Sequence, residues 1–416
     1  MTATDTPGPS PTPSLAPPLA PPLAGIVVLD LGQIYQGPYA GFLAAQAGAQ
    51  VIKVESPQGE PLRRRARVRG GSVPLAMLNA NKRGVTLDLK AAAGKEVFRR
   101  MAARADVVIE NFAPGVMDRL GLGYAALSDL NPRLVYASGT GYGLSGPDRD
   151  NLAMDLTVQA YSGLMSVTGF PDRPPVKAGP AIADFVGGVH LFAAICAALF
   201  QRADTGRGRM IEVAMEEAVY PALASNIGMY FGTGAAPRTG NRHGGLSMAP
   251  YNVYAARDGY VAIIVVTEAH WHNLLAAIGR ADLRDDPRYA SNEARVARMD
   301  EVDALVEDWT RQHDRDQVFA AARRHGVPTA PVRDLDEVVH DPHMHERGML
   351  SWVDHPEVGR VVVPASPLRF HGTAAPDHRF SPAQGADNRA VYVDWLGLDE
   401  ADYDSLVADG VIANDG

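Results

Sequence analysis

The feature that most constrains the fold is a strand–helix–strand pattern between residues 25 and 55. Residues 25–31 (GIVVLDL) form an apolar run typical of a buried strand. Residues 37–47 carry the small side chains of a closely packed helix, and residues 51–55 (VIKVE) repeat the strand pattern. Because two strands joined by a helix lie parallel in one sheet, this unit predicts a parallel sheet.

The same alternation continues along the chain. Further strands are predicted at 85–89, 106–110, 134–138 and 210–214, and helices at 92–104, 184–202 and 215–230. The pattern predicts an α/β fold with an open, Rossmann-like parallel sheet, which binds ligands at the carboxyl ends of its strands. We therefore expect the site at the loops that follow residues 31, 55, 89, 110 and 138.

The pattern changes after residue 230. A glycine-rich stretch at 232–245 precedes two strand patterns, 251–255 and 260–266, that flank a turn at 257–259 and predict a hairpin. We predict a large domain over 25–227, a smaller inserted α+β domain over 228–328, and a return to the large domain over 329–416. The acidic end of this last segment, 399–416, is predicted to form a surface helix and a frayed tail.

Composition limits the classes of protein to consider. Residues 1–24 contain eight prolines and predict a disordered tail. No Lys or Arg precedes Lys53, which argues against a secretion signal or a mitochondrial leader, and the longest apolar run, 189–200, is too short to cross a bilayer. The net charge of −9 argues against nucleic acid and membrane partners. We expect a cytoplasmic protein whose single cysteine, Cys196, is a packed thiol.

Asp184 is the most isolated charge in the chain. No other charged residue lies between Lys177 and His190, and a long apolar helix begins near Asp184. The free N–H groups and the positive end of a helix dipole are expected to keep such a carboxylate ionised, which suits a nucleophile. The alternative is an N-cap with no chemical role.

A basic run stands out in this acidic protein. Residues 61–87 contain seven basic residues and no acidic one, namely Arg63, Arg64, Arg65, Arg67, Arg69, Lys82 and Arg83. Such a run suits a polyphosphate, and Lys90 at the end of a predicted strand strengthens this interpretation. The alternative is a solvated loop.

Two other patterns point away from common cofactors. The first predicted turn has glycines at 32, 37 and 41, spaced five and four apart instead of two and three, which argues against a nicotinamide fingerprint. His340, His343 and His345 flank a turn at Pro342, and no cysteine is near them. We therefore interpret them as ordinary surface histidines and predict no metal site.

The ordered set of motifs resembles the class III CoA-transferases, the group of formyl-CoA transferase, carnitine CoA-transferase and α-methylacyl-CoA racemase. The resemblance covers about residues 24–400. Its motifs are Leu29-Asp30 through Gln36-Gly37-Pro38, VIKVE at 51–55, NKRGVTLDLK at 81–90, residues 106–115, Asn131-Pro132-Arg133, and TGRG at 205–208.

The resemblance implies a dimer of two interlocked chains, with Asp184 as the catalytic aspartate. It implies no permanently bound cofactor, because coenzyme A or acyl-CoA is the substrate. The family's CoA contacts fall on Tyr35, Gln36, Leu87, Asp88, Leu89, Lys90, Asn111, Phe112, Ala113, Arg119 and Met215.

This sequence departs from the family's patterns at three places. Ser56 replaces an arginine of formyl-CoA transferase, so the Arg63–Arg69 run is expected to supply that phosphate contact. Only Gly244-Gly245 stands near the place of a longer glycine loop, which argues against formyl and oxalate as the acids. Met154-Asp155 replaces the His-Asp pair of the racemases, which removes one of the two acid/base groups that a racemase needs.

The predicted function is transfer of CoA from an acyl-CoA donor to a carboxylic-acid acceptor, through an aspartyl mixed anhydride and an aspartyl-CoA thioester. Asp155 is predicted to be a second site carboxylate, the alternative being a surface helix cap. An acyl-CoA racemase or epimerase, an NAD-dependent reductase and a non-catalytic acyl-CoA-binding protein remain alternatives. The donor and acceptor acids are not identified.

Overall fold

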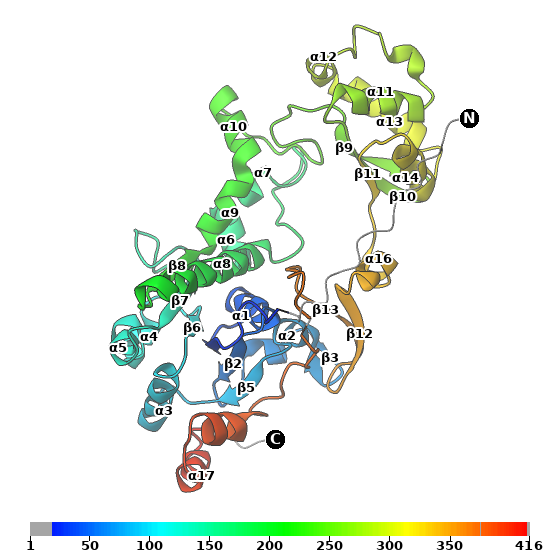
Figure 1. The fold of residues 1–416 in the computed structure, drawn as a ribbon. Helices are drawn as coiled ribbons and strands as arrows, with labels where there is room; N and C mark the ends of the chain where they lie inside the picture. The colour runs from blue at the N-terminus through cyan, green and yellow to red at the C-terminus, as the bar shows by residue number, and fades with distance from the viewer. Residues whose placement is uncertain (1–18, 375, 414–416) are drawn as a thin grey trace, which may run out of the picture.

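The computed structural model describes residues 19–374 and 376–413, and its main feature is a six-stranded parallel sheet (Figure 1). The strand order is β5-β2-β1-β6-β7-β8. The strands are β1 (Val27–Asp30), β2 (Gln50–Glu55), β5 (Arg83–Thr86), β6 (Val107–Glu110), β7 (Val135–Thr140) and β8 (Met210–Ala214). Each lies where the sequence predicted a strand, so the predicted α/β fold with an open parallel sheet is confirmed.

Helices cover both faces of the sheet. On one face, α1 (Gln36–Gln46) and α8 (Ile182–Thr205) pack on Val28 and Val51. On the other face, α3 (Ala92–Ala102) packs on Leu29 and Ile52, the next residues of the same strands. Because successive side chains of a strand point to opposite faces, a strand covered on both faces is mostly apolar. This explains the continuous apolar runs in the sequence.

The strand order switches sides between β1 and β6. The chain begins at β1, adds β2 and β5 on one side, and then crosses back to pair β6 with β1, followed by β7 and β8. The loops that leave β1 and β6 therefore diverge at the carboxyl edge, which is the usual ligand position in such sheets.

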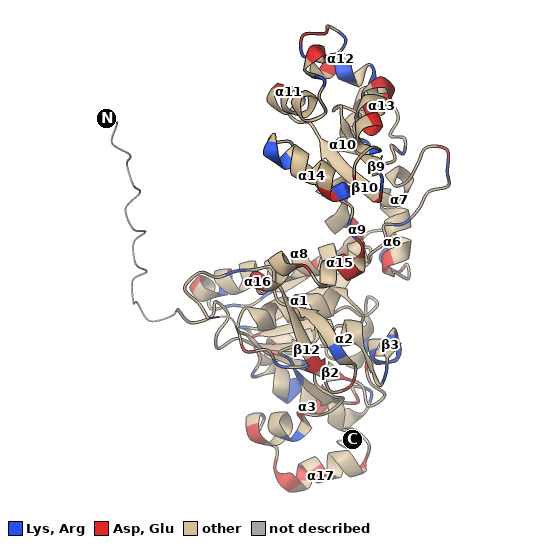
Figure 2. Ribbon diagram, turned by 90° about the vertical axis from the view of Figure 1, so that its right-hand side faces the viewer, with Lys and Arg blue, Asp and Glu red and all other residues tan. Residues whose placement is uncertain are grey.

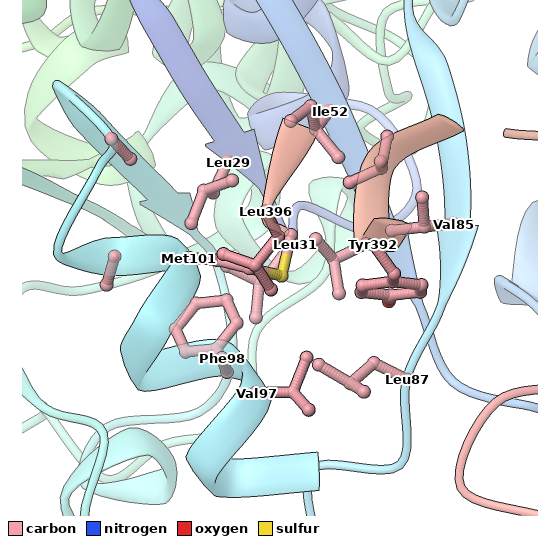
Figure 3. Close-up of a cluster of buried hydrophobic side chains, with 14 of the residues drawn as sticks. Leu29, Leu31, Ile52, Val85, Leu87, Val97, Phe98, Met101, Tyr392 and Leu396 are labelled. Atoms are coloured by element: carbon pink, nitrogen blue, oxygen red, sulfur yellow. The ribbon is translucent and has the colours of Figure 1, made fainter. Parts of the chain in front are cut away.

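The C-terminal segment completes the core under the sheet. A π-helical turn, η4 (Ala390–Trp395), brings Tyr392 to Val85 and Leu87 in Figure 3, and Leu396 lies near Leu31. The acidic helix α17 (Glu400–Ala408; Figure 2) buries Tyr403 and Leu406 in the same cluster. The expectation of a surface helix is therefore only half right, because one face of α17 belongs to the core. Residues 414–416 lie outside the described part.

A separate three-stranded sheet forms the smaller unit at the upper right of Figure 1. The predicted hairpin is present as β9 (Tyr251–Ala256) and β10 (Gly259–Ile264), which pair antiparallel. β11 (Thr329–Pro331) pairs with β10, so this sheet extends past the bound predicted at 328. Its helical elements are α11 (Glu268–Ala277), η3 (Ala281–Leu283), α12 (Asn292–Val296), α13 (Met299–Thr310) and α14 (Arg315–Arg324). The division into domains as a whole remains a prediction.

Several short elements were not predicted. The helix expected at 215–230 is three pieces, α9 (Met215–Val219), η2 (Tyr220–Leu223) and α10 (Ala224–Thr233), because Pro221 lacks the N–H that a continuous helix needs. The other helical elements are η1 (Pro61–Arg64), α2 (Val73–Leu78), α4 (Val116–Leu120), α5 (Tyr124–Leu130), α6 (Asp155–Tyr161), α7 (Leu164–Val167), α15 (Leu335–Val339) and α16 (Pro342–Glu346). Two small hairpins are β3 (Arg67–Val68) with β4 (Gly71–Ser72), and β12 (Leu350–His355) with β13 (Gly359–Pro364).

The end of the proline-rich segment contacts the folded chain. The N–H of Leu19 donates to the carbonyl of Gly372, and that of Leu23 donates to the carbonyl of Ala47. Residues 19–24 therefore contact the end of α1 and the segment after β13, contrary to the prediction of a disordered tail over 1–24. Residues 1–18 lie outside the described part.

One helix of the described chain, α8, is long and apolar enough to cross a membrane by length and composition. Leu191, Ile195 and Ala198 of this helix are buried in the cluster that covers the large sheet. This packing explains part of its apolar composition, since 39% of the apolar window is buried inside the protein.

Candidate active site

The loops that follow β1 and β6 are joined by hydrogen bonds at the point where the strand order switches sides. The backbone N–H of Gln33 donates to Oδ1 of Asn111 at 2.7 Å, and Nδ2 of Asn111 donates to the carbonyl of Gln33 at 2.9 Å. Asn111 was predicted as a site residue, whereas Gln33 was not. This reciprocal pair fixes the floor between two adjoining pockets.

The first pocket has a volume of about 500 Å³ and lies at the carboxyl ends of β1, β2 and β5. The predicted residues Leu87, Asp88, Leu89 and Lys90 line it, and so does Phe112. Lys90 is exposed at its wall, where an ammonium group can meet a phosphate of a bound ligand.

The second pocket has a volume of about 380 Å³ and contains Asp184. It shares Gln33 and Phe112 with the first pocket, so the two form one continuous wall. The other predicted residues that line it are Gln36, Asn111, Ala113 and Met215.

Two predicted contacts are not part of this wall. Tyr35 faces a third pocket, on the other side of the loop that follows β1. Arg119 is an exposed residue of α4 that lines neither of the two adjoining pockets. The roles of all these residues in CoA binding remain predictions.

Asp184 lies in the first turn of α8 and is 8% exposed. Burial and the nearby charge of Asp155 raise its pKa from 3.8 to about 7, although the backbone N–H of Gln36 donates a hydrogen bond to its carboxyl group. The helix start therefore does not keep the pKa of Asp184 low, and the carboxyl is only partly ionised near neutral pH.

Burial is the larger cause of this shift in pKa, and Asp155 is the second. Oδ1 of Asp155 accepts the backbone N–H of Ala183 at 2.9 Å and that of Asp184 at 3.3 Å, and its Oδ2 accepts Nε2 of Gln159 at 2.6 Å. Asp155 thus uses N–H groups of α8 that were expected to stabilise Asp184. Asp155 belongs to α6 but caps α8. Each of the two sequence interpretations, a carboxylate beside Asp184 and a helix cap, therefore describes part of its position.

Two glycines let α8 approach the loop that carries Gln36. A Cβ on Gly188 would lie 2.8 Å from the carbonyl oxygen of Gln36, and one on Gly187 would lie 3.0 Å from Nε2 of Gln36. Both distances are too short for an unstrained contact. The absence of side chains at these positions therefore allows the hydrogen bond between Gln36 and Asp184.

Two residues of the basic run, Arg63 and Lys82, have buried carboxylate partners within the fold. Arg63 forms a two-pronged ion pair with Glu55, with both bonds at 2.7 Å, and the Glu55 side chain is only 2% exposed. Lys82 is fully buried, and its Nζ donates to Asp30 and to the carbonyl of Pro38, both at 2.8 Å. Arg64, Arg65, Arg67 and Arg69 are exposed around β3 (Figure 2). The sequence could not reveal that Arg63 and Lys82 have partners within the fold.

Buried charges also hold the loop after β1, and the sequence analysis missed this role. Ile34 has a left-handed backbone with φ of 63°, and its N–H donates to Oε1 of Glu60 at 2.7 Å. Lys53 donates to the carbonyl of Gly32, and Oδ1 of Asp30 accepts the N–H of Gly32 at 2.8 Å. A left-handed β-branched residue is strained and persists only where its surroundings hold it.

The histidines and the cysteine considered in the sequence lie outside the two adjoining pockets. Nδ1 of His340 contacts the carbonyl of Asp336, and Nε2 of His345 contacts that of Val339. No group of three potential metal ligands occurs in residues 19–374 and 376–413. Cys196 is a partly buried thiol of α8, and burial raises its pKa.

Comparisons with known proteins show the family. Residues 23–388 match the model of CoA-transferase family III. The formyl-CoA:oxalate CoA-transferase of Streptomyces avermitilis is 38% identical, over 93% of this chain and 98% of the relative. The succinate–glutarate CoA-transferase of Agrobacterium fabrum is 35% identical, over 88% of this chain and 94% of the relative.

A solved structure shares the whole architecture. The crystal structure of a CAIB/BAIF family protein from Brucella suis is 36% identical and superposes with a TM-score of 0.79, covering 90% of this chain and 99% of that chain. Motifs, fold and relatives thus agree over nearly the full length, and the chain belongs to CoA-transferase family III.

Proposed function

We propose that this protein transfers CoA from an acyl-CoA donor to a carboxylic acid, with Asp184 as the nucleophile. The observation that carries the proposal is the position of Asp184. Its buried carboxyl lies in the second of two continuous pockets, which begin at Lys90 and meet at Gln33 and Phe112. An elongated thioester bound along this wall would bring its carbonyl carbon to Asp184.

The first half of the reaction uses only the donor. An oxygen of ionised Asp184 attacks the thioester carbonyl carbon, the C–S bond breaks, and the electron pair leaves with the CoA thiolate. The thiolate then attacks Cγ of Asp184 in the mixed anhydride. The C–O bond of the anhydride breaks, the donor acid leaves as a carboxylate, and an aspartyl-CoA thioester remains.

The second half reverses these steps with the acceptor. Its carboxylate attacks Cγ of Asp184 and displaces the CoA thiolate, which forms a new mixed anhydride. The thiolate then attacks the acyl carbon of the acceptor, which yields the new acyl-CoA and free Asp184. One thioester replaces another, so the cycle needs no ATP, metal or permanently bound cofactor.

Asp155 is proposed to hold the first turn of α8 and to set the ionisation of Asp184. Its carboxylate accepts two N–H groups of that turn. A nucleophile with a pKa near the working pH combines a useful ionised fraction with high basicity.

We also propose a cytoplasmic homodimer. Large apolar side chains are exposed on α8 and on the segment that follows it, including Val189, Phe200, Tyr220, Tyr230 and Phe231. Exposed aromatic side chains are enriched at protein interfaces. The net charge of −9 disfavours nucleic acid and anionic membranes as partners.

A trapping experiment tests the proposal. Enzyme incubated with an acyl-CoA donor and no acceptor should carry an activated aspartyl group, and hydroxylamine should convert it to a hydroxamate on Asp184. Peptide mass mapping would locate the tag. Asp184→Ala should abolish both tag and transfer, whereas Asp204→Ala, at an exposed position of the last turn of the same helix, should retain both.

Other outcomes would replace the proposal. A tag on Asp155 would exchange the roles of the two carboxylates, and confirmed transfer without any tag would indicate direct attack by the acceptor. Exchange of the α-proton with deuterated water in the absence of an acid would indicate a racemase. Binding of acyl-CoA with no turnover across a panel of acids would indicate a carrier.

A further inference from the structure

Side chains of other segments hold the loop that follows β1, one residue after another. Two buried charged residues, Asp30 and Lys53, hydrogen-bond to the backbone of Gly32. Gln33 exchanges two hydrogen bonds with Asn111. The chain between β1 and α1 therefore takes its shape from contacts outside itself.

Glu60 holds the next residue, Ile34. Oε1 of Glu60 accepts the backbone N–H of Ile34 at 2.7 Å, and the backbone of Ile34 has a φ of 63°. A β-branched residue is strained in this left-handed conformation and would leave it without such a partner. Glu60 lines the first pocket, whereas Ile34 lines the pocket of Asp184, so this hydrogen bond joins the walls of the two pockets.

Two residues after Ile34, the chain reaches the nucleophile. The backbone N–H of Gln36, the first residue of α1, donates to the carboxyl group of Asp184. The first N–H groups of a helix have no acceptor within it, so the backbone that precedes Gln36 sets the direction of this N–H. A change in the φ of Ile34 would turn the N–H of Gln36 away from Asp184.

Stability alone explains the position of Glu60 poorly. The residue is only 3% exposed, and within the described part of the chain Oε2 of its carboxyl has no hydrogen-bond partner. Burial raises the pKa of this carboxyl, although the charge of Lys53 and the N–H of Ile34 oppose the shift. A buried carboxyl with an unsatisfied oxygen costs free energy of folding. This cost points to a role in the loop that Glu60 holds.

We propose that Glu60 is a positioning residue for the nucleophile, because it holds Ile34 in its left-handed conformation. The turn so formed keeps the N–H of Gln36 on the carboxyl of Asp184. This inference rests on the proposed function, and it adds a residue that lies outside the pocket of Asp184. Glu60 forms and breaks no covalent bond, and it acts only through the loop.

The test compares Glu60→Gln with Glu60→Met. Both replacements are uncharged and similar in length to glutamate, but only glutamine keeps an oxygen that can accept the N–H of Ile34. Their difference therefore isolates the hydrogen bond from the charge and the volume of the side chain. The donor is the best wild-type substrate among formyl-, acetyl- and succinyl-CoA, and the acceptor is the best among oxalate, succinate and glutarate.

Transfer is measured by mass detection of the new acyl-CoA, across pH and donor concentration. Rates are expressed per active site, counted by the hydroxamate tag on Asp184 after incubation with donor alone. An unfolded fraction of a variant then cannot imitate a loss of kcat.

Glu60→Gln should keep most of the wild-type kcat, and Glu60→Met should lower it at least tenfold, because small displacements of reacting groups are costly. The donor KM should be similar in the two variants, since their side chains occupy the same volume at the first pocket. The acid limb of donor kcat/KM should lie about one pH unit higher in Glu60→Met, because the lost N–H favours ionised Asp184.

Thr310→Val is the matched control for loss of a buried hydrogen bond to the backbone. Thr310 is fully buried in the smaller unit, where its Oγ1 donates to the carbonyl of Ala255 at 2.7 Å. This variant should unfold at a lower temperature and keep the wild-type kcat and acid limb. If Glu60→Met does not fold, Glu60→Ala removes the same acceptor with a smaller side chain, and it should show the same fall in kcat and the same shift of the limb.

The outcomes separate this inference from the reaction on which it rests. If transfer occurs and the variant without the acceptor matches Glu60→Gln in kcat and acid limb, Glu60 serves stability alone and the reaction stands. A limb that stays in place or moves to lower pH would show that Glu60 does not secure the N–H of Gln36. If no acid accepts CoA in the wild type and no hydroxamate forms on Asp184, the proposed reaction itself fails.

Discussion

Oδ1 of Asp155 lies 3.3 Å from the backbone nitrogen of Asp184 and accepts its N–H. The second carboxylate thus helps to hold the helix turn that presents the first, and its charge also disfavours ionisation of Asp184. Positioning and electrostatic tuning are coupled in one residue, and substitutions can separate the two effects.

The first prediction concerns pH. Because burial and Asp155 raise the pKa of Asp184 to about 7, and only the ionised form attacks the thioester, donor kcat/KM should fall about tenfold per pH unit below that value. Asp155→Asn removes the charge, while its amide oxygen can still accept the N–H of Ala183. The acid limb should move to lower pH in stopped-flow measurements of CoA release. A limb that stays in place would show that Asp155 does not tune Asp184.

The second prediction concerns stability. A carboxyl whose pKa is raised in the folded state does not lower the free energy of unfolding below pH 4, where it is protonated in both the folded and the unfolded state. The loss of stability grows as the unfolded state ionises, and it is complete above about pH 7, where the folded state ionises too. Asp184→Asn should therefore raise the free energy of unfolding at pH 8, by on the order of 3 kcal/mol, and change it little at pH 4. Thermal unfolding at both pH values checks this, and equal loss of stability at both would contradict it.

The third prediction tests the close approach of α8. Gly188→Ala would place a Cβ 2.8 Å from the carbonyl oxygen of Gln36, so the loop must shift away from Asp184. We expect kcat to fall at least tenfold, because small displacements of reacting groups are costly. Gly228→Ala is the control, since a Cβ there meets nothing within 4 Å in α10, and it should retain activity with unchanged or higher stability. Equal activity in the two variants would contradict the packing argument.

The fourth prediction separates two basic residues that the sequence groups together. Lys90→Ala should raise the donor KM several-fold, with a weaker salt dependence, because it removes a charge at the first pocket. Arg63→Ala should instead lower the free energy of unfolding by about 3 kcal/mol, because it leaves Glu55 buried without its partner. Chemical denaturation together with donor titrations would distinguish the two effects. A large rise in donor KM for Arg63→Ala at normal stability would instead indicate that Arg63 contacts a phosphate of the donor.

Much of the fold was predictable because the large sheet follows simple rules. Strands such as Val107–Glu110 are buried on both faces and are apolar up to their last residue. The hairpin β12–β13 was missed because it carries a weaker pattern, with only some residues buried. The helix after β8 was predicted as one piece because the surrounding residues keep a helical periodicity. The break at Pro221 divides it into three.

The sequence could predict which residues lie at the site better than it could predict the contacts between them. Asp184, Asn111 and Met215 reach one pocket as expected. The link between Asp155 and α8 joins segments whose contact no local pattern encodes, and with burial it raises the pKa of Asp184. Lys82 reads as part of a solvated basic run until its buried partner, Asp30, is known.

The cluster under the large sheet has a consequence for biosynthesis. Leu29 from the first strand and Tyr392 from the C-terminal segment belong to the same buried core. A ribosome makes these residues near the two ends of the described chain, so this core cannot close until translation is almost finished. Until then, the strand that emerges first must remain exposed or be shielded by chaperones, and folding of this core is largely post-translational.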